Sequence, residues 1–216
     1  LIHTLEDRDR KVFFHTDNSV LSRRQYAEKL SGMGIPAEEE NVLTSGYVAA
    51  EHLSSEGITE TYVIGESGLV NELDRRGIEV KKDAETAVVG LDRQLSYEKI
   101  RKAKSIAESG GKIFLLSTEE TFRRGERNLP HQGATNCVFQ NFEETELLGK
   151  PSQIYRDTFR DYFSYFADKS IMIGDRIADI ETGNRLGMKT ASVMSGELDR
   201  ETLASAEGLQ EPDIGV

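Results

Sequence analysis

The sequence IMIGDRIADIETGNRLGMKTASVMSG, residues 171–196, contains two short apolar runs separated by a polar segment. The first run ends at Gly174-Asp175, and a second carboxylate, Asp179, follows about one helical turn later. The apolar runs predict two strands, and the segment from about Ile177 predicts a helix between them. A strand, a helix and a second strand in this order indicate a βαβ unit, which builds a parallel sheet.

The same alternation of strands and helices continues through most of the chain. Ser22 and Gln25 form a capping-box pattern ahead of one predicted helix, and Ser96 stands at the start of another. The segment 118–150 is polar and predicts irregular structure with one short helix near Cys137. Further strands are predicted at residues 11–15, 61–65, 86–90 and 112–117. This pattern predicts an α/β fold with a Rossmann-like, mostly parallel sheet, in which ligands bind at the carboxyl ends of the strands.

The composition of the 216 residues excludes some classes of partner. With 27 basic and 38 acidic residues the formal net charge is −11, so neither nucleic acid nor an anionic membrane is expected as a partner. No apolar run is long enough to cross a bilayer, and the first residues show no signal-peptide pattern. The single cysteine, Cys137, cannot form an internal disulfide, which favours a cytoplasmic location.

The acids and their polar neighbours allow two interpretations each. Asp175 either caps a helix or faces the strand-end crevice and binds Mg²⁺, an ion that takes one or two carboxylates and keeps several waters. Asp179 either complements the helix dipole or orients a ligand water or a basic partner. Thr16 belongs either to a helix-entry turn or to a phosphate cradle made with the N–H groups that follow it. Lys150 is either a surface lysine or a positive charge that stabilises a phosphoryl group.

Four stretches together resemble the haloacid dehalogenase (HAD) superfamily, and within it the NagD-like and 4-nitrophenylphosphatase branch. GDRIADIETGNRLGMKTASVMSG resembles the fourth motif of that branch, and LLGKPSQIYRDTF resembles the third, with Lys150 at its lysine position. KVFFHTDNSVLSRRQYAEKLSGMGI resembles the second motif, with Thr16 at the phosphate-binding position, and TAVVGLDRQLSYEKI resembles a recurrent segment of the cap domain. The four matches follow the order of the family over nearly the whole chain.

The resemblance implies a HAD-like core of residues 1–59 and 147–216, with a smaller α/β cap domain inserted at residues 60–146. It also implies an Mg²⁺-dependent phosphatase that hydrolyses a small phosphomonoester, such as a sugar, glycerol-type or nucleotide phosphate, through an aspartyl-phosphate. Its residues are assigned by position in the motifs: Thr16, Asp17 and Asn18 to substrate binding, Lys150 and Asp179 to catalysis, and Asp175 to the metal.

The first motif of the family, Asp-x-Asp-Gly after the first strand, has no counterpart in this sequence. Asp7-Arg8-Asp9 has the right spacing but precedes a strand, so we interpret it as a solvated turn. In the order of the family the motif would lie upstream of Leu1, and we therefore expect the nucleophile outside these 216 residues, in a longer chain. A partner segment that supplies the first strand is the less favoured alternative.

Two departures from the family pattern leave a second function open. Asp17 stands where the family usually has Asn, and STEETF, from Ser117, replaces the usual Thr-Asn-Pro-Asp of the cap. A catalytically inactive module that binds a phosphorylated ligand or a protein is therefore the alternative. A nucleotide-cofactor protein is disfavoured, since GESG lacks the G-x-G-x-x-G spacing. Turn or solvated roles are favoured over substrate contacts for four cap residues: Asp92, Arg123, Arg124 and Arg127. The sequence leaves the substrate and the oligomeric state open, with a homodimer among the alternatives.

Overall fold

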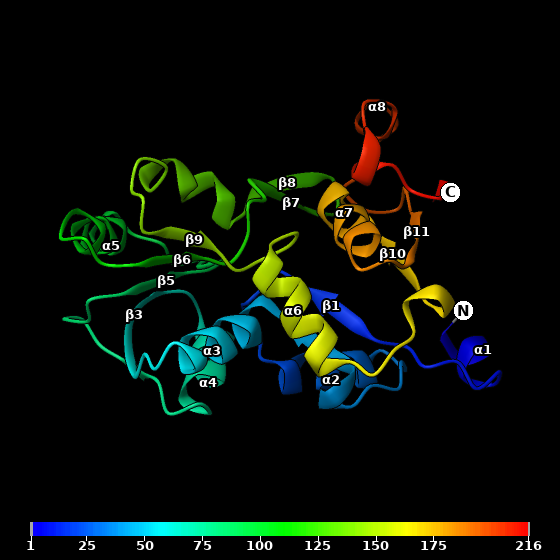
Figure 1. Cartoon of the computed structure of the whole chain (residues 1–216), viewed down its shortest axis with the longest axis horizontal. Coiled ribbons are helices and arrows are strands. Elements are labelled where there is room, and N and C mark those ends of the chain that lie inside the picture. The colour runs from blue at the N-terminus through cyan, green and yellow to red at the C-terminus, as the bar shows by residue number, and fades with distance from the viewer. Residues whose placement is uncertain (1, 216) are drawn as a thin grey trace.

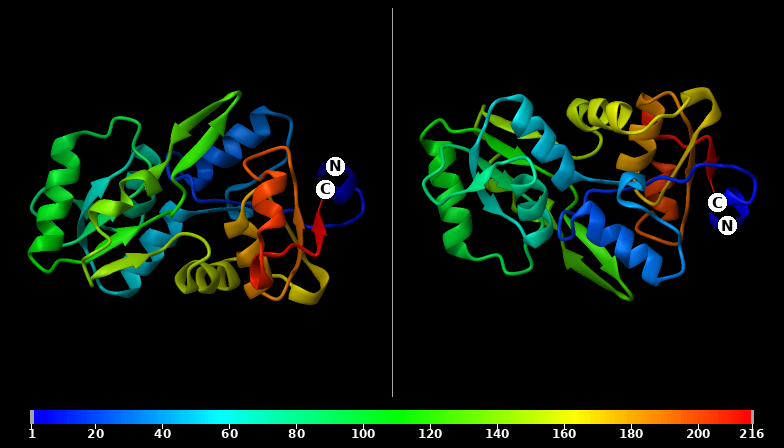
Figure 2. Two further views of the ribbon diagram at one scale, coloured as in Figure 1. Left: turned by 90° about the horizontal axis from the view of Figure 1, so that it is seen from above. Right: turned by 90° about the horizontal axis from the view of Figure 1, so that it is seen from below.

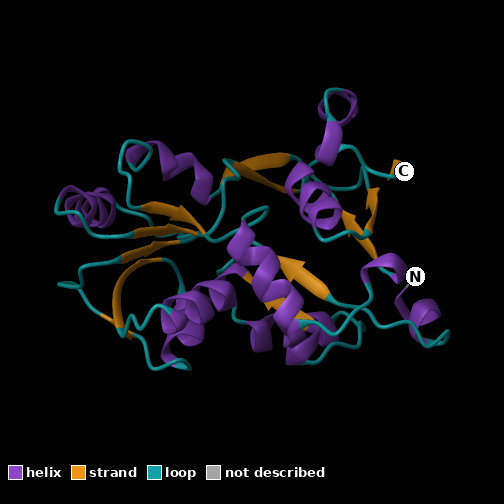
Figure 3. Cartoon of the chain, viewed as in Figure 1, coloured by secondary structure: helices purple, strands orange, loops and turns teal. Residues whose placement is uncertain are grey.

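The computed structural model describes residues 2–215, in which helices and strands alternate (Figure 3). The first part of the chain contributes α1 (Ile2–Glu6), β1 (Phe14–Thr16), α2 (Arg23–Gly32), η1 (Glu39–Asn41), β2 (Val42–Thr44) and α3 (Ser45–Ser55). β1 and β2 pair in parallel. The capping box predicted for α2 is present, because the side chains of Ser22 and Gln25 each accept a hydrogen bond from the other's backbone N–H.

A five-stranded parallel sheet forms the second part of the molecule (Figure 1). This part contains β3 (Glu60–Ile64), α4 (Ser67–Asp74), β4 (Glu79–Val80), β5 (Ala87–Val89), α5 (Tyr97–Glu108), β6 (Ile113–Leu115) and β9 (Thr145–Leu147). The strand order is β4-β3-β5-β6-β9. Side chains alternate between its two faces: Val88 and Phe114 pack in a cluster with α3 and α4, whereas Val89 and Ile113 pack in a cluster with α5. Helices therefore cover both faces of this sheet.

An antiparallel hairpin, β7 (Thr121–Arg124) and β8 (Arg127–Pro130), connects β6 to η2 (Gln132–Val138). The prediction of irregular structure for this segment was wrong here, because both strands are polar and exposed and carry no apolar alternation. The cross-strand pair Phe122 and Leu129 is half-buried, and Gly125 adopts a positive φ of 64° in the turn. The short helix predicted near Cys137 is η2.

The last part of the chain builds a three-stranded parallel sheet in the order β10-β11-β12. It contains α6 (Gln153–Tyr162), η3 (Ala167–Lys169), β10 (Ile171–Gly174), α7 (Ile177–Arg185), β11 (Lys189–Ser192), α8 (Arg200–Ala204), η4 (Gly208–Gln210) and β12 (Ile214–Gly215). The βαβ unit predicted from residues 171–196 is present as β10, α7 and β11. Within residues 2–215, β1 pairs only with β2 and β10 only with β11, and a cavity separates these two strands.

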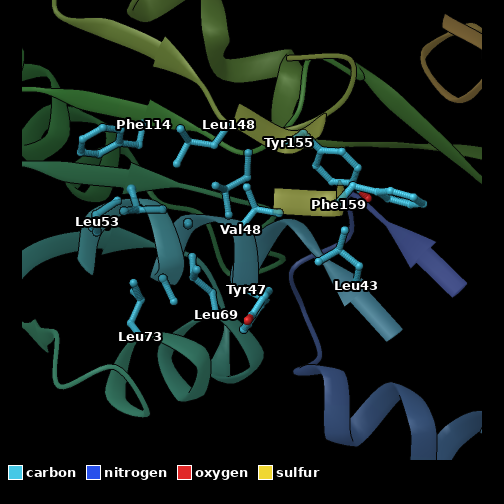
Figure 4. Packing of buried hydrophobic residues seen from close by; sticks show 14 of the residues in the cluster. Leu43, Tyr47, Val48, Leu53, Leu69, Leu73, Phe114, Leu148, Tyr155 and Phe159 are labelled. Atoms are coloured by element: carbon cyan, nitrogen blue, oxygen red, sulfur yellow. The ribbon is translucent and has the colours of Figure 1, made fainter. Parts of the chain in front are cut away.

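One hydrophobic cluster joins the parts of the molecule (Figure 4). Leu43 of β2 and Val48 of α3 pack in it with Leu73 of α4 and Phe114 of β6. Tyr155 and other aromatic residues of α6 complete it. The cluster thus spans segments that lie far apart in the sequence and fixes the carboxyl ends of the strands relative to one another.

The predicted fold class is confirmed, with a mostly parallel α/β architecture and helices between the strands. The five-stranded sheet begins at Glu60 and ends at Leu147, while the division into a core and a cap at residues 60–146 stays a prediction. None of the helices in the described part of the chain has the length and apolar character needed to cross a membrane.

Gly68 provides a test of how α4 is joined to the turn that follows β1. Its N–H donates to the carbonyl of Val20 at 3.0 Å, and a Cβ at this position would lie 2.2 Å from the carbonyl carbon of Leu21. Gly68→Ala should lower the free energy of unfolding by about 1–3 kcal/mol, because backbone must shift to admit the methyl group. Urea unfolding measures this loss, and Gly32→Ala, with no atom within 4 Å of the added Cβ, should show none. Equal stabilities of the two variants would contradict the close packing.

Candidate active site

All six residues predicted for the site line one cavity of about 350 Å³, between the carboxyl ends of β1 and β10. The turn after β1 contributes Thr16, Asp17 and Asn18, and Lys150 comes from the loop before α6. Asp175 follows β10, and Asp179 lies in the first turn of α7. Segments far apart in the sequence therefore meet at one edge. This is the geometry that parallel strands produce, although the chemical role of each residue stays a prediction.

The turn after β1 is held by hydrogen bonds of its own side chains. The N–H of Asn18 donates to Thr16 Oγ1 at 3.1 Å, and the N–H of Val20 donates to Asn18 Oδ1 at 3.0 Å. Ser45 Oγ donates to the carbonyl of Asp17 at 2.7 Å, and the Tyr26 hydroxyl donates to the carbonyl of Asn18 at 3.1 Å. Thr16 Oγ1 accepts the Asn18 N–H, its side chain is also hydrogen-bonded to Tyr26, and the residue lines the cavity.

Lys150 and Asp179 form a buried ion pair at the back of the cavity. Nζ of Lys150 bonds Oδ1 of Asp179, and each side chain is only 6% exposed, so the interpretation of Lys150 as a surface lysine was wrong. Burial alone would lower the pKa of Lys150, but the carboxylates of Asp17 and Asp179 hold that pKa above its ordinary value. Burial alone would raise the pKa of Asp179, but Lys150 holds it below its ordinary value. Both groups are therefore charged near neutral pH.

Two glycines permit this close approach. A Cβ at Gly174 would lie 2.2 Å from Cβ of Asp179, and a Cβ at Gly149 would lie 2.0 Å from the carbonyl oxygen of Leu116. Each glycine adjoins a residue of the site, Gly174 before Asp175 and Gly149 before Lys150. The lack of a side chain at these positions lets the ion pair form in the crevice between the strands.

The N-terminus of α7 is capped differently from the simpler interpretation of the sequence. The N-cap residue is Arg176, and Asp179 Oδ2 accepts its N–H at 3.2 Å. Asp179 thus serves both the helix end and Lys150. Asp175 lies outside the helix and, because it does not cap it, retains a carboxylate at the mouth of the cavity.

Asp175 is the residue best placed for a metal ion. Its Oδ2 accepts the N–H of Glu197 at 3.0 Å, the carboxylate is half-buried, and no hydrogen bond to Oδ1 is found within residues 2–215. The described residues contain no cluster of three histidine, cysteine or acidic side chains that could hold a metal. Asp175 would supply one carboxylate oxygen to an ion held here, and hard divalent cations take such ligands.

Asp17 is buried beside Lys150, whose backbone N–H donates to Asp17 Oδ1 at 3.3 Å. Burial raises the pKa of Asp17 from its ordinary value of 3.8 to about 7, although the charge of Lys150 opposes the shift. Burial also lowers the pKa of the neighbouring His15 to about 4, with Lys150 adding to this shift, so His15 is neutral at pH 7. The negative charge that Asp17 brings to the cavity is thus partly neutralised near neutral pH.

A second cavity of about 820 Å³ adjoins the first, and Asn18, Phe122 and His131 line both. The turn after β1 and α2 form one wall of it, and the β7–β8 hairpin, which lies beside α2 in both views of Figure 2, forms another. Burial, followed by the charge of Arg176, lowers the pKa of His131 to about 4, so this imidazole is neutral at pH 7. Sequence reasoning missed Phe122 and His131, because neither belongs to a pattern that indicates a strand end.

The roles of the remaining candidates stay predictions, and two of them, Asp92 and Arg124, line the second cavity. Asp92 is buried, but Lys99 Nζ at 2.5 Å and the N–H of Gln94 at 2.8 Å occupy its carboxylate. Asp7 and Asp9 are exposed in the turn that precedes β1. Arg124 and Arg127 are exposed on the hairpin.

Arg123 is exposed, as predicted, and it also bonds the loop between β11 and α8. Its guanidinium donates to the carbonyl of Gly196 at 3.2 Å, and its backbone N–H donates to Oε1 of Glu197. The hairpin is therefore bonded to the loop between β11 and α8, which lies next to Asp175.

Comparisons with known proteins agree with this arrangement. A family model described as haloacid dehalogenase-like hydrolase matches residues 1–79, and a second, HAD-hydrolase-like, matches residues 147–215. The chain is 30% identical to the chloroplastic phosphoglycolate phosphatase 1A of Arabidopsis thaliana, over 97% of this chain and 66% of that protein. It is also 30% identical to an acid sugar phosphatase of Staphylococcus epidermidis, over 89% of this chain and 76% of that protein. The crystal structure of a 4-nitrophenylphosphatase from Thermotoga maritima superposes with a TM-score of 0.87 and 27% identity, over 99% of this chain and 84% of that one.

The burial of Asp17 predicts a characteristic dependence of stability on pH. Because its pKa is higher in the folded protein than in the unfolded chain, the folded protein holds the extra proton between the two values. The stability that this group contributes is complete below the unfolded pKa and is lost as the pH rises through about 7.

Asp17→Asn removes the carboxyl group that titrates, so the variant does not lose this stability as the pH rises. Its free energy of unfolding relative to the parent protein should therefore grow from about pH 5.5 to about pH 8, by about 2 kcal/mol. Urea unfolding at both pH values measures the change, and Asp7→Asn, at an exposed position, is the control. A difference that is constant with pH would contradict the raised pKa.

Proposed function

The chain belongs to the haloacid dehalogenase-like hydrolases, and we propose that it is a phosphatase that hydrolyses small phosphomonoesters with the help of Mg²⁺. One observation carries the proposal: a buried, charged Lys150 faces the same cavity of about 350 Å³ as the Thr16 hydroxyl and the half-buried carboxylate of Asp175. This combination supplies a fixed positive charge, a hydroxyl group and a hard oxygen ligand around one cavity.

Each residue has a defined role in the proposed reaction. The Thr16 hydroxyl and nearby N–H groups hold phosphoryl oxygens, and Lys150 compensates the negative charge that develops during transfer. Asp179 keeps Lys150 charged and in place through the buried ion pair. Asp175 would hold Mg²⁺, which when bound supplies further charge compensation and orients the phosphate. Positioning and charge compensation account for most of the catalysis in such reactions.

The attacking carboxylate of the proposed mechanism is none of the acids that line the cavity. Of the acids that line the cavity, Asp17 accepts the Lys150 N–H, Asp179 is paired with Lys150, Asp175 accepts the N–H of Glu197, and Glu119 is paired with Arg176. Among residues 2–215, β1 pairs only with β2 and β10 only with β11, and both strands border the same cavity, so a further strand between them would deliver a carboxylate to Thr16 and Lys150.

The adjoining cavity indicates the class of substrate. Its volume of about 820 Å³ is far larger than a two-carbon acid requires, and it is lined by both apolar and polar side chains, among them Leu91, Leu129 and Tyr26. We therefore propose a substrate whose organic part is the size of a sugar, a nucleoside or an aryl group, rather than glycolate.

A phosphate-binding module without turnover is the second candidate, and Asp17 is the observation that favours it. A buried acid beside the phosphate cradle repels a phosphate dianion whenever it is ionised. The raised pKa lessens this repulsion at neutral pH, which is why we place turnover first. The cytoplasmic location and the homodimer stay predictions.

Hydrolysis of 4-nitrophenyl phosphate by the protein expressed from its whole reading frame tests the proposal. We expect turnover that requires Mg²⁺ and disappears with a chelator. Thr16→Val should lower kcat/KM by roughly 100-fold, since it removes the hydroxyl and keeps the shape, whereas Thr16→Ser should stay within about threefold of the parent protein. Phosphate binding without any turnover would favour the inactive module.

A series of phosphomonoesters tests the proposed substrate class. Values of kcat/KM for nucleoside monophosphates or sugar phosphates should exceed the value for 2-phosphoglycolate by about tenfold or more, because only the larger groups fill the second cavity. Leu129→Trp, which fills that cavity from the hairpin, should reduce the advantage of the larger substrates and leave 2-phosphoglycolate little changed. A preference for 2-phosphoglycolate would contradict this substrate class.

A further inference from the structure

Glu197, in the loop between β11 and α8, contacts both the hairpin and the predicted metal ligand. Its side-chain Oε1 accepts the backbone N–H of Arg123 in β7 and lies 3.6 Å from a guanidinium nitrogen of Arg176. Its own backbone N–H donates to Oδ2 of Asp175 at 3.0 Å. One residue therefore connects the hairpin, which lines the cavity of about 820 Å³ proposed for the organic part of the substrate, to the carboxylate of Asp175 in the cavity of about 350 Å³ proposed for the phosphate.

The packing around this connection leaves little freedom. A Cβ at the preceding Gly196 would lie 1.8 Å from Oδ2 of Asp175, so the Gly196–Glu197 peptide rests directly on that carboxylate. The Arg123 guanidinium donates to the carbonyl of Gly196 at 3.2 Å, which holds the same peptide from the hairpin side. Movement of β7 away from the loop would release the peptide and with it the bond to Asp175.

Arg176 makes further contacts with Glu197 and with the start of the hairpin. Its guanidinium pairs with Glu119, which precedes the hairpin, and donates to the carbonyl of Thr121 in β7 at 3.1 Å. The side chains of Arg176 and Glu197 are 18% and 19% exposed. Because this shielding limits screening by water, the pair contributes more than an exposed surface pair does.

We propose that Glu197 is a positioning residue that couples the seating of the β7–β8 hairpin over the substrate cavity to the orientation of Asp175. The proposal rests on the proposed function for the role of Asp175 as a metal ligand. When the hairpin is seated, the peptide of Glu197 fixes Oδ2 of Asp175 and leaves Oδ1 for the ion. By linkage the effect is reciprocal, so an ion on Asp175 favours the seated hairpin to the same extent.

Hydrogen exchange and Mg²⁺ binding to the whole protein measure the two sides of this coupling without any substrate. In the parent protein, Mg²⁺ alone should slow amide exchange in peptides that cover residues 121–130. Glu197→Ala should raise exchange in the hairpin, abolish its response to Mg²⁺ and weaken Mg²⁺ binding in calorimetry by roughly 3- to 10-fold. Glu197→Gln, which keeps an acceptor for the Arg123 N–H, should retain part of the coupling.

Glu201→Ala is the matched control, because it removes the same charge at an exposed position in α8. It should leave hairpin exchange and Mg²⁺ affinity at the parent values. Equal protection of the hairpin by Mg²⁺ in the parent protein and in Glu197→Ala would overturn the coupling, as would a parent hairpin that does not respond to Mg²⁺. Absence of phosphatase turnover combined with Mg²⁺-dependent protection would overturn the proposed function and leave the coupling intact.

Discussion

The buried ion pair between Lys150 and Asp179 constrains the geometry of the whole site. An ammonium group and a carboxylate withdrawn from water must lie in contact, because removal of one partner from such a pair costs about 3–5 kcal/mol. The contact requires the loop before α6 and the first turn of α7 to meet beneath the ends of β1 and β10. Gly149 and Gly174 allow this meeting, because any side chain at either position would collide with the neighbouring segment. The stability of the fold and the geometry of the site therefore both depend on the contact between Lys150 and Asp179.

The pair also explains how an acidic protein can attract a phosphate. With a net charge of −11 the molecule repels anions at long range, so attraction must be local. Lys150 supplies a positive charge that is shielded from water and salt, where its electrostatic effect is largest. The partial protonation of Asp17 at neutral pH removes part of the opposing charge. The local electrostatic potential in the cavity therefore differs from the long-range potential that the acidic surface produces.

Much of this site could be predicted from the sequence, and the rest could not, for physical reasons. Thr16 and Asp175 each follow an apolar run, and the carboxyl ends of parallel strands lie at one edge of the sheet, so their convergence follows from pattern alone. The burial of Lys150 depends on contacts with distant segments, which no local pattern encodes. The β7–β8 hairpin carries polar side chains on both faces, so it shows neither strand nor helix periodicity. Phe122 and His131 line the cavities as part of that hairpin and the residue after it, and Glu197 bonds to it through Arg123.

The hydrophobic cluster that joins α3, α4 and α6 has a consequence for how the molecule moves. A hinge rotation of the five-stranded sheet relative to α6 would disrupt the cluster that contains Leu73, Phe114 and Tyr155 and would expose apolar surface to water. Such a rotation is costly, whereas the exposed hairpin has few apolar contacts to lose. Small molecules would then enter and leave through local movement of the β7–β8 hairpin. The five-stranded sheet and the rest of the protein would unfold together as one cooperative unit.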